Sequence, residues 1–209
     1  MINKIAAFIS IPKCATKTIL NMFDLGFNRD NDADDPINHY VIYENHQTMR
    51  VLNSKYDLTD IFTFTFVRHP FDRVKSWFLY HKYNVKIPMY QDISLNEWIT
   101  QGCKTHWKVQ NGTNWEQLNE SPLLQYNFIH GEKRIDFIGK MESFEKDCKE
   151  VIDILNKKFI ENNISKTITF DHVKENSLCK NVSETLTEES KQIIFNLFKK
   201  DFEYFEYKY

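Results

Sequence analysis

A loop near the N-terminus carries residue types that suit phosphate or sulfate. The apolar run at residues 5–9 has the length of a buried strand, and Pro12 stops it because proline cannot donate to a sheet ladder. Apolar positions restart after the loop with helical spacing. A loop that ends at a helix N-terminus presents backbone N–H groups and the positive end of the helix dipole, which favours an anion. Lys13 adds a positive charge there, and Thr16 and Thr18 add hydroxyl donors.

Three other interpretations of this stretch are a Walker-type nucleotide loop, a phosphatase loop and a purely structural corner. A Walker-type nucleotide loop needs two glycines before its Lys-Ser/Thr pair; Lys17 and Thr18 fit the pair, but both glycines are missing. A phosphatase loop of the Cys-x5-Arg type would use Cys14 as its nucleophile, but Leu20 stands at the arginine position. An ordinary strand–loop–helix corner with a solvent-facing lysine stays open at this point.

A second basic residue follows the clearest strand in the chain. Residues 61–67 are β-branched and aromatic without a breaker, as in a central strand of a parallel sheet. Arg68 comes next, and Pro70 suits the first turn of a helix that carries Ser76 two turns on. Arg68 is a planar donor fork for a phosphate dianion, and Ser76 can add a hydroxyl donor. The structural alternative for Arg68 is an ion pair with Asp72.

Both stretches resemble the nucleotide-binding segments of sulfotransferases that use 3′-phosphoadenosine 5′-phosphosulfate (PAPS). Residues 12–18 resemble the family's 5′-phosphosulfate loop, and residues 66–78 are similar to its 3′-phosphate segment. Residues 138–144, 172–177 and 201–205 resemble further family motifs in the same order. Order and spacing best fit the carbohydrate-type branch, which modifies heparan, chondroitin and dermatan. The animal members carry a membrane anchor that this sequence lacks, so the resemblance favours a soluble microbial or viral member.

The resemblance implies a role for each residue of the two segments. The loop would hold the 5′-phosphosulfate, while Arg68 and Ser76 would hold the 3′-phosphate. Lys13 would also be catalytic, because it would stabilise charge on the leaving phosphate during in-line transfer of the sulfonate to a hydroxyl, without a metal ion. The implied donor-binding set is Lys13, Cys14, Ala15, Thr16, Lys17, Thr18, Arg68 and Ser76. The chain departs from the family pattern at Cys14, Lys17 and His69.

The catalytic base must come from outside these segments. Members of this branch often use a histidine between the first helix and the arginine strand, and the segment around His46 resembles theirs. An ordinary histidine is partly neutral at neutral pH and can accept a proton. His46 is therefore the predicted base, with a surface histidine of no special role as the alternative. His39 is the second candidate for the base and Glu44 the third.

Short strands alternate with helices along the chain. This pattern indicates an α/β fold with a mostly parallel central sheet flanked by helices, and the resemblance implies a P-loop-like arrangement in three layers. Ligands of such sheets bind at the carboxyl ends of the strands, where Lys13 and Arg68 are both expected. We expect one domain over residues 1–209, with residues 83–119 as an acceptor-side insertion.

Composition narrows the class of protein. The 209 residues, of which 42% are hydrophobic, are enough for one full core. A net charge of −2 gives no general field that would draw nucleic acid or an anionic membrane. No apolar run approaches the roughly 18 residues of a membrane span, and the N-terminus shows no signal-peptide pattern. Four scattered cysteines without a Cys-x-x-Cys pair indicate free thiols, so the expected location is the cytoplasm.

The predicted function is therefore sulfonate transfer from PAPS to an acceptor hydroxyl on a carbohydrate or glycoconjugate. A nucleotide kinase-like phosphotransferase is one alternative, but it would need Mg²⁺ ligands and a glycine-rich loop. A nucleotide-binding protein without turnover is another. Within the acceptor segment, Trp98 is expected in the core, whereas Trp107 and Trp115 could be core residues or could stack on sugar rings.

Overall fold

The structure of this chain is a computed structural model that describes residues 4–23, 40–110, 112–171 and 184–209. His39 and the 172–177 motif lie outside the described residues. The chain divides into two compact units, Met1–Val67 with Phe128–Val173 and Arg68–Asn127 with Lys174–Tyr209, and each is described by itself.

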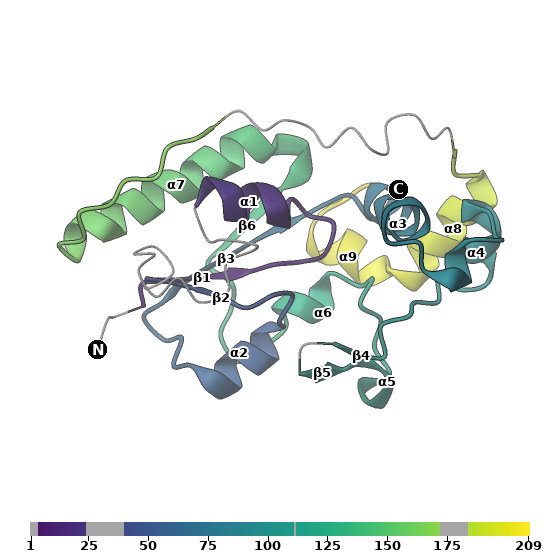
Figure 1. The fold of residues 1–209 in the computed structure, drawn as a ribbon, viewed down its shortest axis with the longest axis horizontal. Helices are drawn as coiled ribbons and strands as arrows, with labels where there is room; N and C mark the ends of the chain where they lie inside the picture. The colour runs from purple at the N-terminus through teal and green to yellow at the C-terminus, as the bar shows by residue number, and fades with distance from the viewer. Residues whose placement is uncertain (1–3, 24–39, 111, 172–183) are drawn as a thin grey trace. The chain divides into compact units, whose positions relative to one another are not determined.

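A parallel four-stranded sheet is the basis of the first unit. Its strands lie in the order β2-β1-β3-β6: β1 (Ala6–Ile9), β2 (Val41–Tyr43), β3 (Phe62–Val67) and β6 (Phe137–Lys140). Figure 1 shows α1 (Thr16–Met22) and α7 (Phe144–Glu161) on one side of this sheet and α2 (Met49–Lys55) on the other. A short 3-10 turn, η3 (Met141–Ser143), joins β6 to α7. The predicted α/β class, with a parallel sheet flanked by helices, is confirmed.

The strand order creates a switch point between β1 and β3. The chain leaves β1 towards β2 on one edge, and it leaves β3 towards β6 on the opposite edge. In open parallel sheets, ligands bind outside the carboxyl ends of the strands at such a point. Lys13 follows β1 in the chain and Arg68 follows β3 directly, so both predicted motifs begin at these two strand ends.

Aromatic and hydroxyl side chains alternate along β3, so they face opposite sides of the sheet. Phe64 stacks on Phe8 of β1 with ring centroids 5.2 Å apart. The buried Thr65 hydroxyl donates to a β1 carbonyl at 2.6 Å, which satisfies its hydrogen-bonding capacity inside the core. At Gly139, which pairs with Phe66, an added Cβ would lie 2.5 Å from that ring, so a glycine is required where β6 meets β3.

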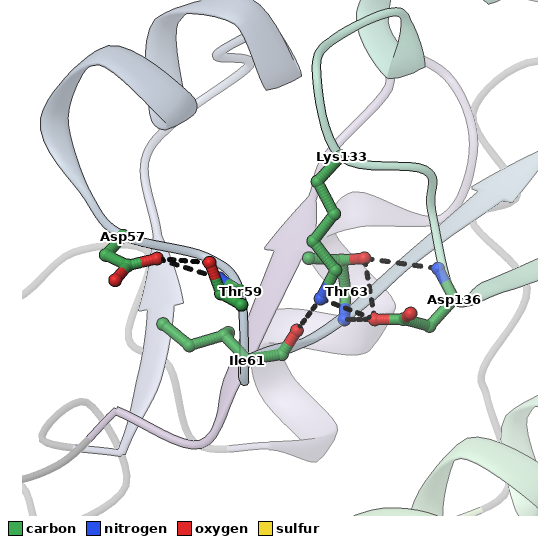
Figure 2. Close-up of polar contacts among 6 residues, drawn as sticks. All are labelled: Asp57, Thr59, Ile61, Thr63, Lys133 and Asp136. Atoms are coloured by element: carbon green, nitrogen blue, oxygen red, sulfur yellow. Dashed lines mark hydrogen bonds and ion pairs between the residues drawn. The ribbon is translucent and has the colours of Figure 1, made fainter.

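Polar contacts align the start of β3 with the segment before β6 (Figure 2). Oδ2 of Asp136 accepts from the Thr63 N–H at 2.7 Å and from the Thr63 hydroxyl at 3.0 Å, and it pairs with the Lys133 ammonium at 2.9 Å. Lys133 also donates to the Ile61 carbonyl. Burial alone would raise the pKa of Asp136, but the hydrogen bonds from Thr63 and Lys133 outweigh it and lower the pKa of this carboxyl. These contacts hold β6 in register.

The second unit is mainly helical. Its elements are α3 (Pro70–Leu79), the π-helical turn η1 (Tyr80–Val85), the 3-10 turn η2 (Pro88–Tyr90), α4 (Leu95–Thr100), the hairpin of β4 (Val109–Gln110) and β5 (Thr113–Asn114), α5 (Trp115–Leu118), α8 (Glu188–Leu197) and α9 (Lys199–Tyr204). The short α6 (Tyr126–Ile129) spans the boundary between the units in the chain. In the ranges that the structure describes, no helix is both long and apolar enough to cross a membrane.

Most of the tryptophans are buried in the second unit. Trp77 and Trp98 belong to one buried cluster, so the expected core position of Trp98 is confirmed. Trp115 is also buried. Trp107 is only half-buried and packs edge-on against Trp77 with ring centroids 4.9 Å apart. Trp107 is therefore the one of the three tryptophans in residues 83–119 that keeps an accessible surface.

Candidate functional site

The loop after β1 adopts a backbone that usually requires glycine. Lys13 has φ of 69° and Ala15 has φ of 58°, both in the left-handed region. Each non-glycine residue there costs on the order of 1–2 kcal/mol in local strain, which the surrounding structure must offset. Left-handed residues interspersed in a turn direct successive N–H groups into one concavity, the arrangement known as an anion nest. The loop thus has left-handed residues at two positions although it contains no glycine.

Side chains of the loop divide between packing and exposure. The Cys14 thiol is buried and donates to the Pro12 carbonyl at 3.8 Å, and the Thr16 hydroxyl donates to the Ile11 carbonyl at 3.4 Å. Both side chains are therefore directed to the loop's own backbone. Lys13 is half-buried and Lys17 is exposed, so these two can present positive charge to an anion.

The start of α1 adds further backbone N–H groups next to the loop. Ala15 is its N-cap and supplies no side-chain hydrogen bond to the first turn. N–H groups in the first turn of a helix have no acceptor inside the helix, and they carry the positive end of its dipole. Thr18 is half-buried in this first turn.

His46 is tied to the same loop through Ser10. The His46 N–H donates to the Ser10 hydroxyl at 3.0 Å, and His46 Nδ1 lies 2.9 Å from the Ser10 carbonyl oxygen. A carbonyl oxygen only accepts, so Nδ1 carries the hydrogen and the neutral ring has its lone pair on Nε2. Ser10 is fully buried directly after β1, and His46 itself has φ of 53°. The structure therefore brings the predicted base and the predicted anion loop together in one unit.

Glu44, the third candidate for the base, is engaged elsewhere. Its carboxylate pairs with the Lys55 ammonium at 2.5 Å and accepts from the Tyr56 hydroxyl at 2.8 Å. The hydrogen bond to Glu44 raises the pKa of Tyr56. Glu44 thus joins β2 to the end of α2, which makes it a poor proton acceptor for a substrate.

Arg68 and Ser76 lie in the second unit. Among the described residues no ion pair joins Arg68 to Asp72. The half-buried Arg68 is instead held by its backbone: its N–H donates to Gln125 Oε1 and its carbonyl accepts from Gln125 Nε2, both at 2.9 Å. Ser76 is half-buried on α3, two turns further along the chain.

His69, where the chain departs from the family pattern, caps the helix that follows it. It is the N-cap of α3, and its Nδ1 accepts from the Phe71 N–H at 3.3 Å. Its Nε2 lies 3.0 Å from the Lys208 carbonyl oxygen and therefore donates to it. One neutral tautomer satisfies both contacts, so this departure is a change of capping residue.

Sequence reasoning assigned no individual role to four supporting residues, although Arg73 lies in the 66–78 segment and Asp201 in the 201–205 motif. Ser10, Gln125 and Asp201 act through hydrogen bonds to residues far away in the chain. Arg73 is buried, and its guanidinium donates to the carbonyls of Pro122 and Leu123, so it supports the fold and is not available to a ligand. Burial raises the pKa of Asp201 to about 6, against the opposing effect of N–H groups of Gln125 and Tyr126 and of the Arg73 charge. Both oxygens of this carboxyl accept N–H groups, as a carboxylate can.

Comparison with known proteins gives one family. The family model described as "Sulfotransferase family" matches residues 4–208, nearly the whole chain. No curated protein matches the chain at a significant level. Among solved structures, the crystal structure of mouse sulfotransferase SULT7A1 complexed with PAP is similar at 14% identity, over 95% of this chain and 84% of that chain, with a TM-score of 0.49. That similarity is too low to support a conclusion about this chain. In the described ranges, no three or more His, Cys, Asp or Glu side chains are grouped so that they could hold a metal ion.

Proposed function

The chain belongs to the sulfotransferase family, and we propose that it transfers a sulfonate group from PAPS to the hydroxyl of a carbohydrate or glycoconjugate. In the proposed step the acceptor oxygen attacks sulfur in line with the leaving phosphate. A new S–O bond forms and the old one breaks. The acceptor proton goes to the base, and 3′-phosphoadenosine 5′-phosphate (PAP) leaves.

The observation that carries the proposal is the attachment of His46 to the anion loop. Because Ser10 accepts the Nδ1 hydrogen, the basic lone pair of neutral His46 is on Nε2. The same Ser10 lies two residues before the loop that would hold the sulfonate donor. A fixed tautomer next to the donor loop is what a general base for an acceptor hydroxyl requires.

On the donor side, Lys13 and the loop N–H groups would stabilise charge that develops on the leaving phosphate. Fixed dipoles and a charge already in place cost no reorganisation during the reaction. The Cys14 and Thr16 side chains bond to backbone carbonyls, and the Cys14 N–H donates to the Ile11 carbonyl at 3.2 Å. The backbone donors to the 5′-phosphosulfate would therefore be the N–H groups of Ala15 and Thr16, with Cys14 lining the loop. Lys17 would add charge near the sulfonate, and Thr18 a hydroxyl. This set needs no metal ion, since Lys13 and backbone dipoles supply the positive potential.

Recognition of the 3′-phosphate is assigned to Arg68 and Ser76. A guanidinium fork matches two phosphate oxygens at once, which a lysine cannot do. The hydrogen bonds from Gln125 to the Arg68 backbone leave the guanidinium available for this task.

Two experiments test the proposal. Calorimetric titration should show PAP binding, and ATP with Mg²⁺ should bind much more weakly; the reverse order would favour a nucleotide kinase. Sulfur-35-labelled PAPS, offered with sugars, glycolipids, phenols and peptides, should then label a carbohydrate acceptor. PAP binding without transfer to any acceptor would favour a non-catalytic nucleotide-binding protein.

A further inference from the structure

The side chain of Gln125 forms hydrogen bonds with both the backbone N–H and the backbone carbonyl of Arg68. The strand ladder between β3 and β6 ends at Val67, so the N–H and carbonyl of Arg68 lie beyond it. Gln125 Oε1 accepts from the Arg68 N–H, and Gln125 Nε2 donates to the Arg68 carbonyl, both at 2.9 Å. The orientation of the amide follows, because a backbone N–H can only donate and a carbonyl can only accept. The Gln125 amide thus takes the place of a peptide group of a neighbouring strand.

Asp201 in turn holds Gln125. Oδ2 of Asp201 accepts from the Gln125 N–H at 2.9 Å and from Gln125 Nε2 at 3.3 Å. Its Oδ1 accepts from the Tyr126 N–H at 2.9 Å, at the start of α6. Both hydrogens of Nε2 are therefore used, one for Asp201 and one for Arg68, and the side chain of Gln125 cannot rotate without losing bonds.

Burial makes this arrangement rigid. Gln125 and Asp201 are both fully buried. The buried Arg73 compensates the charge of Asp201, and its own hydrogens go to the carbonyls of Pro122 and Leu123, just before Gln125. Breaking any of these bonds would leave a buried polar group without water, which costs about 1–3 kcal/mol. The backbone of Arg68 is therefore fixed, whereas its half-buried side chain can still adjust to a ligand.

We propose that Gln125, with Asp201 behind it, is a positioning residue that fixes the backbone of Arg68 so that its guanidinium meets the 3′-phosphate of the nucleotide. This inference rests on the proposed function, since it takes Arg68 as the 3′-phosphate ligand. A preorganised ligand residue binds more tightly because less conformational freedom is lost on binding. A purely structural Gln125 would instead stabilise the protein without acting through the side chain of Arg68.

The test compares PAP with AMP, which lacks the 3′-phosphate, in a double-mutant cycle. Gln125→Met keeps the size of the side chain and removes its two hydrogen bonds to the Arg68 backbone. It should weaken PAP binding about ten-fold and leave AMP binding unchanged. In the Arg68→Ala background the same substitution should have no further effect on PAP binding. Gln117→Met, on an exposed glutamine of the same unit, is the matched control and should change neither affinity.

If the Gln125→Met variant fails to fold, two further measurements still test the inference. Asp201→Asn loosens the hold on Gln125 and should weaken PAP binding about three-fold, again only while Arg68 is present. In the wild-type protein without ligand, the Arg68 amide should exchange with deuterium at least about 100-fold more slowly than an unprotected amide.

Three outcomes would overturn the inference. Equal loss of PAP and AMP affinity, or additive losses with Arg68→Ala, would make Gln125 merely structural. Fast exchange of the Arg68 amide would mean that its hydrogen bond to Gln125 does not persist in solution. A wild-type protein that binds AMP as tightly as PAP would overturn the proposed function, and this inference with it.

Discussion

Ser10 and His46, 36 residues apart in the chain, are joined by three polar contacts, and the shortest, from His46 Nδ1 to the Ser10 carbonyl oxygen, indicates which nitrogen of the imidazole carries the hydrogen. The Ser10 hydroxyl accepts from the His46 N–H, and the Ser10 carbonyl accepts from Nδ1. The lone pair of the neutral ring is consequently on Nε2. Because Ser10 directly follows β1, these contacts connect the His46 ring to the start of the predicted anion loop.

The first prediction concerns His46 as the base. His46→Ala should lower kcat by about 10²–10⁴ and leave PAP affinity nearly unchanged, because a general base acts only on the acceptor proton. The loss should be smaller with nitrophenols, which ionise without help. Steady-state kinetics and PAP titration measure both quantities. His130→Ala, on an exposed histidine of the same unit, is the control. Full activity in His46→Ala together with loss in His39→Ala would transfer the role to His39.

The second prediction concerns Lys13. Lys13→Ala should reduce turnover by a similar factor with every acceptor, nitrophenols included, because the charge that it stabilises is on the donor. Lys157→Ala, on an exposed lysine of α7, should have no effect. The comparison to make is the ratio of kcat values for a sugar and a nitrophenol in each variant. A Lys13→Ala variant that recovered activity only with nitrophenols would place Lys13 on the acceptor side.

Selectivity for the nucleotide is the third prediction. Arg68→Ala should weaken PAP binding by roughly 2–4 kcal/mol, as expected when one partner of a desolvated charge pair is removed. AMP binding should hardly change. Calorimetry with the two nucleotides measures the difference, with Arg134→Ala at an exposed site as the control. An Arg68→Ala variant that still preferred PAP would show that another group binds the 3′-phosphate.

The fourth prediction concerns metal ions. Transfer activity should survive dialysis against excess EDTA, because Lys13 and the loop dipoles are proposed to supply the positive potential. The assay is sulfonate transfer before and after chelation, with a mock-dialysed sample beside it. Complete loss that Mg²⁺ restores would contradict the proposed chemistry and favour phosphoryl transfer.

The fifth prediction concerns stability and pH. The folded-state pKa of Asp136 is lowered, so its contribution is present above the unfolded-state pKa of about 3.9 and is lost as the pH falls below that value. Asp136→Asn should therefore reduce the free energy of unfolding at pH 7 by about 1 kcal/mol, a modest value because the carboxylate is partly exposed. Urea unfolding should show this gap closing towards pH 3. A gap that is constant across this range, or equal in the exposed control Asp153→Asn, would contradict the assignment.

Sequence alone determined the fold class and the two motifs, because both depend on neighbouring residues. The Phe/Thr alternation of β3, the stop at Pro12 and the start of α3 at Pro70 are local signals. The family resemblance drawn from the loop and the arginine segment is confirmed by the match over residues 4–208. Its carbohydrate branch, its microbial or viral origin and its cytoplasmic location stay predictions.

Tertiary structure alone decided which contacts the residues of these motifs make. The left-handed backbone at Lys13 and Ala15 replaces glycines that sequence comparison would look for. The tautomer of His46 depends on Ser10, and the backbone of Arg68 is held by Gln125, 57 residues away. Local sequence specifies strand and helix periods, whereas hydrogen-bond partners far apart in the chain are set only when the sheet order and the packing of buried polar groups are complete.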